Sequence, residues 1–299
     1  MLYTLENESL IVRISDHGAE LRSVVDRVSG REYLWQGNPA IWDEHSPLLF
    51  PFCGRLKNAE YTYRGKTYPM GVHGFLKETD LPAPTVSGNT MTFTLTETEE
   101  TLAHYPFRFT LTLVYRLEGR TLSFFATVKN TGDETLPFAF GGHPGIAIRM
   151  ENDDIAAGTA IRFDGDVSNA EVYPLINGPF ASPVGRSFPM KNGTLPLDNA
   201  LLDEYNTLIL KNVPETVVLT QTDGMKVGLT RSETLPYFCL WKSTKKGADY
   251  ICLEPWSGTP SDGLSDEVLE DRPGLCRVKV GESENFSYTL TFSDKGDEH

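Results

Sequence analysis

The stretch FRFTLTLVYRL, residues 107–117, has a large apolar residue at every second position. This period of two is typical of a β-strand with one buried face. Gly119 follows it, and residues 122–130 supply a second run that can fold back on the first. The two runs predict an antiparallel hairpin, and the hypothesis for the whole chain therefore starts from β-structure.

Similar patterns occur on both sides of this hairpin. They predict strands at residues 10–14, 21–26, 91–97, 207–211, 215–221, 226–230, 237–241 and 250–253, and a hairpin at 61–68. The runs at 237–241 and 250–253 are almost entirely apolar, as expected of strands buried on both faces. Residues 155–199 are rich in Gly, Pro, Asn and Ser, and predict broken strands with long loops.

Helical patterns are short wherever they occur. Residues 99–104 can form one helical turn, and residues 265–270 are the best candidate for a short helix. There is no fixed repeat, and no change of composition marks a linker. We therefore predict an all-β fold, with residues 1–299 forming a single large antiparallel β-sandwich domain and the charge-rich residues 293–299 forming a frayed tail.

Composition restricts the partners and the compartment. The chain has 27 Lys and Arg against 41 Asp and Glu, a formal charge of −14, which repels nucleic acid and anionic membranes. The N-terminus lacks the pattern of a signal peptide, and no apolar run reaches the roughly 20 residues that cross a bilayer. We expect a cytoplasmic protein with no nucleic-acid or membrane partner. Its four widely spaced cysteines favour reduced thiols over a zinc site or disulfides.

His143 is the first candidate site residue. It lies in Phe140-Gly-Gly-His-Pro-Gly145, where Pro144 biases the preceding residue toward an extended conformation and the glycines allow unusual backbone angles. The chain therefore sets the direction of the imidazole, as a proton donor requires. A hairpin turn that carries a histidine by chance has the same pattern.

Glu254 is the second candidate. In Leu253-Glu-Pro-Trp256 it follows an apolar run, so its carboxylate is expected to lose hydration at a cost in free energy. This cost suggests a function, and a desolvated carboxylate can act as a base. The alternative is a strand-end glutamate that accepts hydrogen bonds from backbone N–H groups or from an arginine such as Arg55.

Arg55 and His73 are candidates for substrate binding. The guanidinium of Arg55 can bond two neighbouring sugar hydroxyls, although the local sequence favours an ordinary ion pair with one of the many carboxylates. His73, before Gly74, can donate or accept a hydrogen bond, but so can a turn histidine that bonds only the backbone. His73, His143 and Glu254 could in principle ligate a metal, although their wide spacing does not indicate one. Trp42 is expected to be a packing residue.

Several motifs occur in an order that resembles one known family. They are Gly18-Ala-Glu-Leu21, Tyr33-Leu-Trp35, Leu49-Phe-Pro51, Gly54-Arg-Leu-Lys57, His73-Gly-Phe75, Tyr105-Pro-Phe107, Gly142-His-Pro144 and Leu253-Glu-Pro-Trp256. This order is similar to that of the aldose 1-epimerase (galactose mutarotase) family, and in detail to its bacterial LacX-type branch. Each motif is weak alone, and together they span essentially the whole chain.

The resemblance implies a β-supersandwich that interconverts the α and β anomers of a free aldose in a concave cleft, without cofactor or metal, as a monomer or homodimer. It assigns Glu254 as catalytic base, His143 as catalytic acid, and Arg55 and His73 as sugar-binding residues. Classical members have Asn where this chain has Gly54, and their sugar-binding aspartate has no clear counterpart here.

The residue types suit this chemistry on their own. Opening a pyranose takes a proton from the C1 hydroxyl and gives one to the ring oxygen, so a carboxylate and an imidazolium suffice and a bell-shaped pH profile is expected. The main alternative is a non-catalytic carbohydrate-binding or sensing protein on the same scaffold. A glycosidase would need two carboxylates, and Glu254 is the single well-placed candidate.

Overall fold

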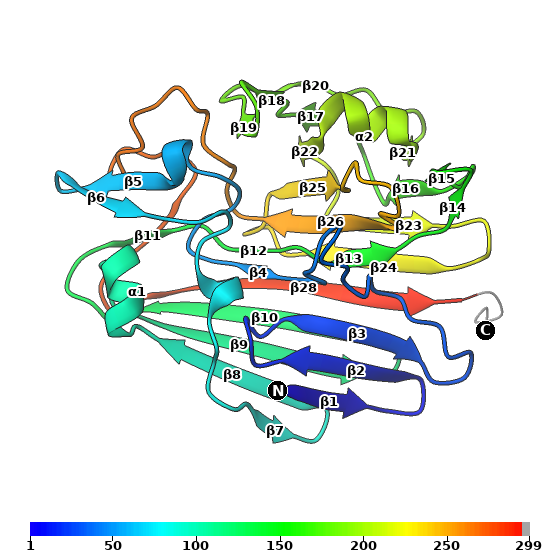
Figure 1. The fold of residues 1–299 in the computed structure, drawn as a ribbon, viewed down its shortest axis with the longest axis horizontal. Coiled ribbons are helices and arrows are strands. Elements are labelled where there is room, and N and C mark those ends of the chain that lie inside the picture. Colours follow the sequence, from blue (N-terminus) through cyan, green and yellow to red (C-terminus); the bar gives the residue numbers. More distant parts are fainter. Residues whose placement is uncertain (295–299) are drawn as a thin grey trace.

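The computed structural model describes residues 1–294, and its main regular structure is antiparallel strands, which include two large sheets packed on one another (Figure 1). The inner faces of the sheets meet through aromatic pairs such as Phe163 with Phe238 and Phe140 with Phe286. The predicted all-β antiparallel sandwich is confirmed. None of the helices within residues 1–294 has the length and apolar character required to span a bilayer.

The larger sheet contains nine strands within the described residues, and the hairpin predicted from residues 107–130 lies inside it. Its order is β21 (Thr194–Pro196), β16 (Ala160–Phe163), β23 (Thr216–Thr220), β24 (Lys226–Arg231), β28 (Ser283–Ser293), β10 (Thr121–Asn130), β9 (Phe109–Glu118), β8 (Thr90–Thr96) and β7 (Thr85–Ser87).

The second sheet contains eight strands of the described chain and carries the candidate site. The order along seven of them is β20 (Arg186–Ser187), β17 (Glu171–Val172), β22 (Thr207–Lys211), β25 (Tyr237–Trp241), β26 (Tyr250–Trp256), β12 (Gly141–Gly142) and β4 (Leu48–Leu49). The eighth strand, β13 (Gly145–Ala147), also pairs with β26.

A three-stranded N-terminal sheet, β1 (Leu2–Glu6), β2 (Leu10–Ser15) and β3 (Leu21–Asp26), lies over β8 to β10 (Figure 1). Tyr3 packs on Phe93, and the Tyr115 hydroxyl donates to the carbonyl of Ala19. The remaining short elements are β5 (Glu60–Tyr63), β6 (Lys66–Pro69), β11 (Leu136–Phe138), β14 (Met150–Glu151), β15 (Asp154–Ile155), β18 (Leu175–Ile176), β19 (Phe180–Ala181), β27 (Cys276–Val278), η1 (Lys57–Ala59), η2 (Leu76–Glu78), α1 (Glu99–His104) and α2 (Asn199–Tyr205).

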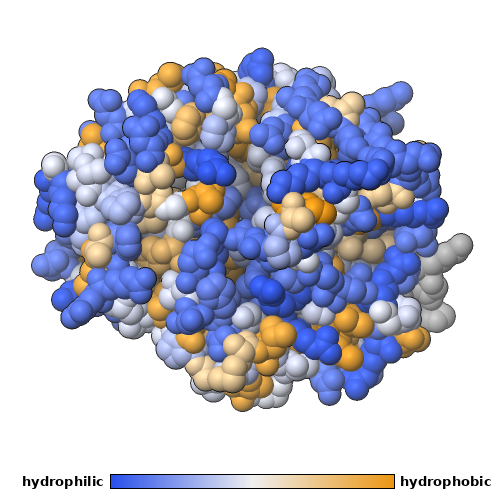
Figure 2. Space-filling view, in the orientation of Figure 1, coloured by the Kyte–Doolittle hydropathy of each residue, from blue (hydrophilic) through white to orange (hydrophobic). Residues whose placement is uncertain are grey.

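Hydrophobic burial links the sheets. One cluster of buried side chains includes Leu5 of β1 and Phe292 of β28, and we propose on this basis that the chain folds as a single domain. The exterior differs clearly from this core: Figure 2 shows a largely hydrophilic surface, on which hydrophobic side chains are scattered in small groups. Such a surface agrees with the strongly acidic composition.

Strand β26 determines which side chains lie on each face of the second sheet. Side chains alternate between the faces of a strand, so Ile251 and Leu253 enter the main core, and Cys252, Glu254 and Trp256 lie on the opposite face. The prediction that this strand is buried on both faces is confirmed, because all seven of its residues are buried. Its end was predicted wrongly, since pairing with β25 continues through Glu254 to Trp256.

Two other predictions fail. Residues 265–270 form no helix, because Glu267 has a φ of 53° and its carbonyl accepts a hydrogen bond from the Thr62 N–H of β5. The predicted frayed tail is wrong at its start, since Ser293 ends β28 and Asp294 pairs with Arg31 at 2.9 Å. Residues 295–299 lie outside the described residues.

Candidate active site

His143 lies on the short segment between β12 and β13, and pairing on both sides fixes that segment. Gly141 is opposite Trp256 and Gly145 is opposite Cys252, so both neighbouring strands pair with β26. The Pro144 carbonyl accepts a hydrogen bond from the Leu253 N–H at 3.0 Å. The imidazole is therefore held directly beside the middle of β26.

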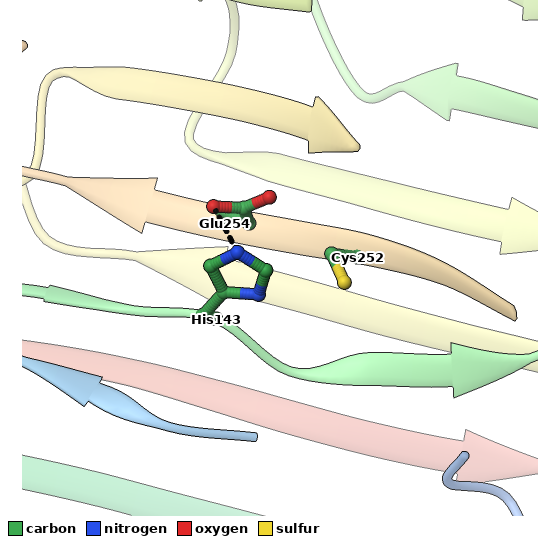
Figure 3. Close-up of side chains that lie close together, drawn as sticks. All are labelled: His143, Cys252 and Glu254. Atoms are coloured by element: carbon green, nitrogen blue, oxygen red, sulfur yellow. Dashed lines mark ion pairs between the residues drawn. The ribbon is translucent and has the colours of Figure 1, made fainter. Parts of the chain in front are cut away.

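Glu254 lies next to His143 on the same side of the sheet, as Figure 3 shows. Nε2 of His143 is 3.1 Å from Oε2 of Glu254, and their side chains are 7% and 0% exposed. The two residues are 111 positions apart in the sequence, so the fold alone brings them together. The sequence placed them at two strand ends facing an open cleft, but the structure places them in contact and buries both.

The pair has unused hydrogen-bonding capacity. Nδ1 of His143 and both carboxylate oxygens of Glu254 are buried and have no hydrogen-bond partner among the described residues. The alternative in which Arg55 or backbone N–H groups satisfy Glu254 is therefore wrong. Buried polar atoms without partners are uncommon in folded proteins and often mark functional positions.

Burial also shifts the protonation of both groups. It lowers the pKa of His143 to about 3 and raises the pKa of Glu254 well above its ordinary value, because each charged form loses hydration. Burial therefore favours the neutral form of each group. The sequence predicted a charged carboxylate and a charged imidazole, so burial shifts the pKa of each group in the direction opposite to that prediction.

Three aromatic side chains surround His143. Their ring centroids lie 5.2 Å away for Trp42, 5.6 Å for Trp241 and 5.3 Å for His73. All three are part-exposed, so a ligand would reach the pair between these rings. The sequence assigned Trp42 to packing and did not single out Trp241. Trp241 could have been found from the strand pairing, because it lies opposite Cys252, two residues before Glu254.

His73 is held in one tautomer by the backbone of Gly54. Nδ1 of the His73 ring accepts a hydrogen bond from the Gly54 N–H at 3.0 Å, and the backbone N–H of His73 donates to the Gly54 carbonyl at 2.9 Å. Burial, followed by the neighbouring His143, lowers the pKa of His73 well below its ordinary value. Neutral His73 with Nδ1 as acceptor carries its proton on Nε2, which makes Nε2 a donor.

Gly54 has a structural reason to be glycine. Its φ is 76°, and an added Cβ would lie 2.3 Å from Cγ of Pro260. Glycine at position 54 therefore lets the backbone lie against Pro260, and its N–H and carbonyl hold His73. Arg55 follows directly, exposed, and within residues 1–294 its guanidinium has no hydrogen-bond or ion-pair partner. The ion-pair alternative for Arg55 is thus wrong for the described part of the chain.

A metal could in principle be held by the residues drawn in Figure 3. The ligand atoms of His143, Cys252 and Glu254 all lie within 4.8 Å of one another, and all three residues are buried. This set differs from the His73, His143 and Glu254 combination considered from the sequence. Burial raises the pKa of the Cys252 thiol well above its ordinary value, which disfavours the thiolate that metals bind. A cation there would also occupy the carboxylate and imidazole that contact each other.

Comparison with known proteins agrees with the fold and motifs. The family profile described as "Aldose 1-epimerase" matches residues 1–291. Protein LacX of Lactococcus lactis subsp. lactis is 28% identical over 303 residues, which cover 97% of this chain and 99% of LacX.

Two solved structures resemble the chain over almost its whole length. A galactose mutarotase related enzyme from Lactobacillus acidophilus has a TM-score of 0.91 and 32% identity, covering 100% of this chain and 99% of its own. A galactose mutarotase-like protein from Lactobacillus casei ATCC 334 has a TM-score of 0.92 and 28% identity, covering 98% and 100%. With its LacX-type relatives, the chain therefore belongs to the aldose 1-epimerase family.

Proposed function

We propose that this protein is an aldose 1-epimerase, an isomerase that interconverts the α and β anomers of a free aldose by opening and reclosing the sugar ring. The observation that carries the proposal is the contact between Glu254 and His143, a buried carboxylate and a buried imidazole 3.1 Å apart. Their remaining polar atoms have no hydrogen-bond partner within residues 1–294. Such a pair can exchange protons with two neighbouring oxygens of a ligand.

The spacing of the pair suits an acetal carbon. The C1 hydroxyl and the ring oxygen are bonded to the same carbon, so the two groups that serve them must also be neighbours. Glu254 takes the proton of the C1 hydroxyl, His143 gives a proton to the ring oxygen, and the bond from C1 to the ring oxygen breaks. Rotation about C1–C2 exposes the other carbonyl face, and reclosure returns both protons.

The pair carries no net charge in either of its two relevant forms. A neutral imidazole with a protonated carboxyl, and an imidazolium with a carboxylate, contain the same number of protons. Burial favours the first form. A sugar hydroxyl that donates to Glu254 stabilises the carboxylate, so the bound aldose itself favours the form in which Glu254 is the base and His143 the acid.

Arg55 and His73 are proposed to bind the hydroxyls of the sugar. Within residues 1–294 the guanidinium donors of Arg55 have no partner, and the fixed tautomer of His73 provides one more donor at Nε2. The part-exposed rings of Trp42 and Trp241 beside His143 suit the apolar face of a sugar ring. An uncharged aldose also avoids the repulsion that an anionic substrate would meet from a protein with a charge of −14.

The test is anomer exchange, followed by polarimetry or NMR on a panel of aldoses. Glu254→Gln and His143→Asn should each lower kcat/KM by roughly 10² to 10⁴. Glu118→Gln is a matched control, because that carboxylate is exposed at the end of β9. A wild-type protein that accelerates no aldose, or two fully active site variants, would contradict the proposal. Saturable sugar binding without exchange would instead support the carbohydrate-binding alternative.

A further inference from the structure

The indole N–H of Trp256 is a buried donor without a partner among the described residues. Trp256 is 2% exposed and packs with Leu49, Cys53 and Cys239. This packing explains why a large ring stands at position 256, but it does not explain why the ring carries an N–H. Leaving a buried donor unpaired costs free energy that a phenylalanine would avoid. A role for the N–H itself is therefore expected.

The acceptor on the same face is Glu254. The two residues are separated by one position along β26, so their side chains leave the strand in the same direction. Both carboxylate oxygens are also unpartnered. Burial is the larger influence on the pKa of Glu254 and raises it, while the indole of Trp256 lowers it. The indole N–H thus influences the carboxylate, although neither group has a hydrogen-bond partner within residues 1–294.

We infer that Trp256 is a positioning residue whose indole N–H donates to the Glu254 carboxylate and holds the base in its ionised form during the reaction. The inference rests on the proposed function and extends it. It gives the buried base one fixed donor in addition to the hydroxyl of the sugar. A hydrogen bond to the charged form favours that form.

Strand β12 fixes the position of the indole. Gly141 lies opposite Trp256, and a Cβ at Gly141 would be 2.8 Å from Cδ1 of Trp256, the ring atom bonded to Nε1. The absence of a side chain at Gly141 therefore makes room for the edge of the indole that carries the N–H. The ring of His73 meets Trp256 at 66° with centroids 5.7 Å apart.

The other titratable groups around Glu254 donate no hydrogen bond to its carboxylate within residues 1–294. They are His143 from the segment between β12 and β13, Cys252 on β26, Cys239 on β25, Cys53 after β4, and Tyr250 at the start of β26. Burial raises the pKa of each of these thiols and of the tyrosine, so all four stay uncharged. Only His143 shares a proton with Glu254.

Trp256→Phe removes the N–H and keeps an aromatic ring, and it should change the pH profile of kcat/KM in two ways. The pKa of Glu254 rises, so the alkaline limb moves up by roughly one pH unit. The plateau of kcat/KM falls by about tenfold for each unit by which the pKa of Glu254 rises, because a smaller fraction of the pair has Glu254 ionised and His143 protonated. Damage to the fold alone would lower the plateau without moving the limb.

Trp241→Phe is the matched control. It changes a second tryptophan beside His143, on the neighbouring strand, and should leave the alkaline limb unmoved. If Trp256→Phe does not fold, 3-benzothienylalanine at position 256 keeps the fused ring and replaces the N–H by sulfur. The same upward shift is expected for that variant.

Carbon-13 NMR of the Glu254 carboxyl, assigned with Glu254→Gln, measures its titration without any need for activity. A raised pKa in the position-256 variants supports the inference, and an unchanged pKa overturns it. An inactive wild-type protein overturns the proposed function instead, whatever the carboxyl titration shows.

Discussion

Burial of Glu254 and His143 sets which group controls each limb of the activity profile. In the reactive form, Glu254 and His143 together hold one titratable proton. The reactive form disappears when the pair binds a second proton or releases the one it has. The gain occurs on His143, whose pKa is lowered to about 3, and the loss occurs from Glu254, whose pKa is raised by burial. The bell-shaped profile expected from the sequence therefore keeps its shape, but its limbs are assigned differently.

We predict that kcat/KM is level from above about pH 3 up to the raised pKa of Glu254, and falls as the pH rises through that pKa. The alkaline limb belongs to a carboxyl group, whose ionisation has almost no enthalpy, so the limb should stay at the same pH when the temperature changes. Profiles at two temperatures test this. A limb that moves with temperature as an imidazole does would contradict the assignment.

At the scale of single residues, the sequence suggested candidate residues but not their surroundings. His143, Glu254, Arg55 and His73 were singled out because a glycine or proline beside each suggests a fixed backbone. Contact partners that come from other strands leave no such local sign. Strand pairing brings such distant residues together. Only the structure therefore reveals the hydrogen bond between Gly54 and His73 and the tryptophans beside His143.

At the scale of elements, strand β12 is a tight spacer between β4 and β26. We predict that Gly141→Ala lowers the free energy of unfolding by about 1–3 kcal/mol, because the new methyl group overpacks against the Trp256 indole 2.8 Å away. It should also reduce activity, since the indole lies beside Glu254. Urea unfolding, together with anomer exchange, measures both effects.

Gly228→Ala in β24 is the control for this change. Its added methyl group would find no atom within 3.8 Å, so it should leave stability unchanged or raise it by up to about 1 kcal/mol. Equal stability of the two alanine variants would show that β12 has room to spare.

Elements with a strong local pattern were predicted accurately. Strands β3, β22 and β25 and helix α1 begin and end where the sequence indicated. Strand β28 was missed, although Phe286, Tyr288, Leu290 and Phe292 show the same alternation as the opening hairpin. The end of β26 was misplaced because Pro255 suggested a stop, whereas pairing with β25 carries the strand past it. Long-range pairing decided these cases, and local sequence does not contain it.

At the scale of the whole molecule, Asp26 joins the N-terminal sheet to the nine-stranded sheet through Arg120. Burial alone would raise the pKa of Asp26, but hydrogen bonds from Ser29 and Arg120 outweigh it and lower the pKa to about 2. A depressed pKa stabilises the fold above the unfolded-state value, and the gain is lost as the pH falls.

We therefore predict that Asp26→Asn costs roughly 2 kcal/mol at neutral pH and that the difference from wild type disappears between about pH 4 and pH 2. Urea unfolding across this range measures it. Asp133→Asn, in the exposed turn before β11, should show no such pH-dependent loss. A constant difference between wild type and Asp26→Asn at all pH values would mean that the carboxylate charge is not what joins the sheets.

The position of β28 has a consequence for synthesis of the chain. This strand is the last one within residues 1–294, yet it lies between β10 and β24 in the middle of the nine-stranded sheet. Until it emerges, β10 and β24 both present unpaired edges, which are prone to aggregate. The nine-stranded sheet therefore cannot form before residues 283–293 have been made, and a nascent chain that stalls before β28 exposes two strand edges that are paired in the finished sheet.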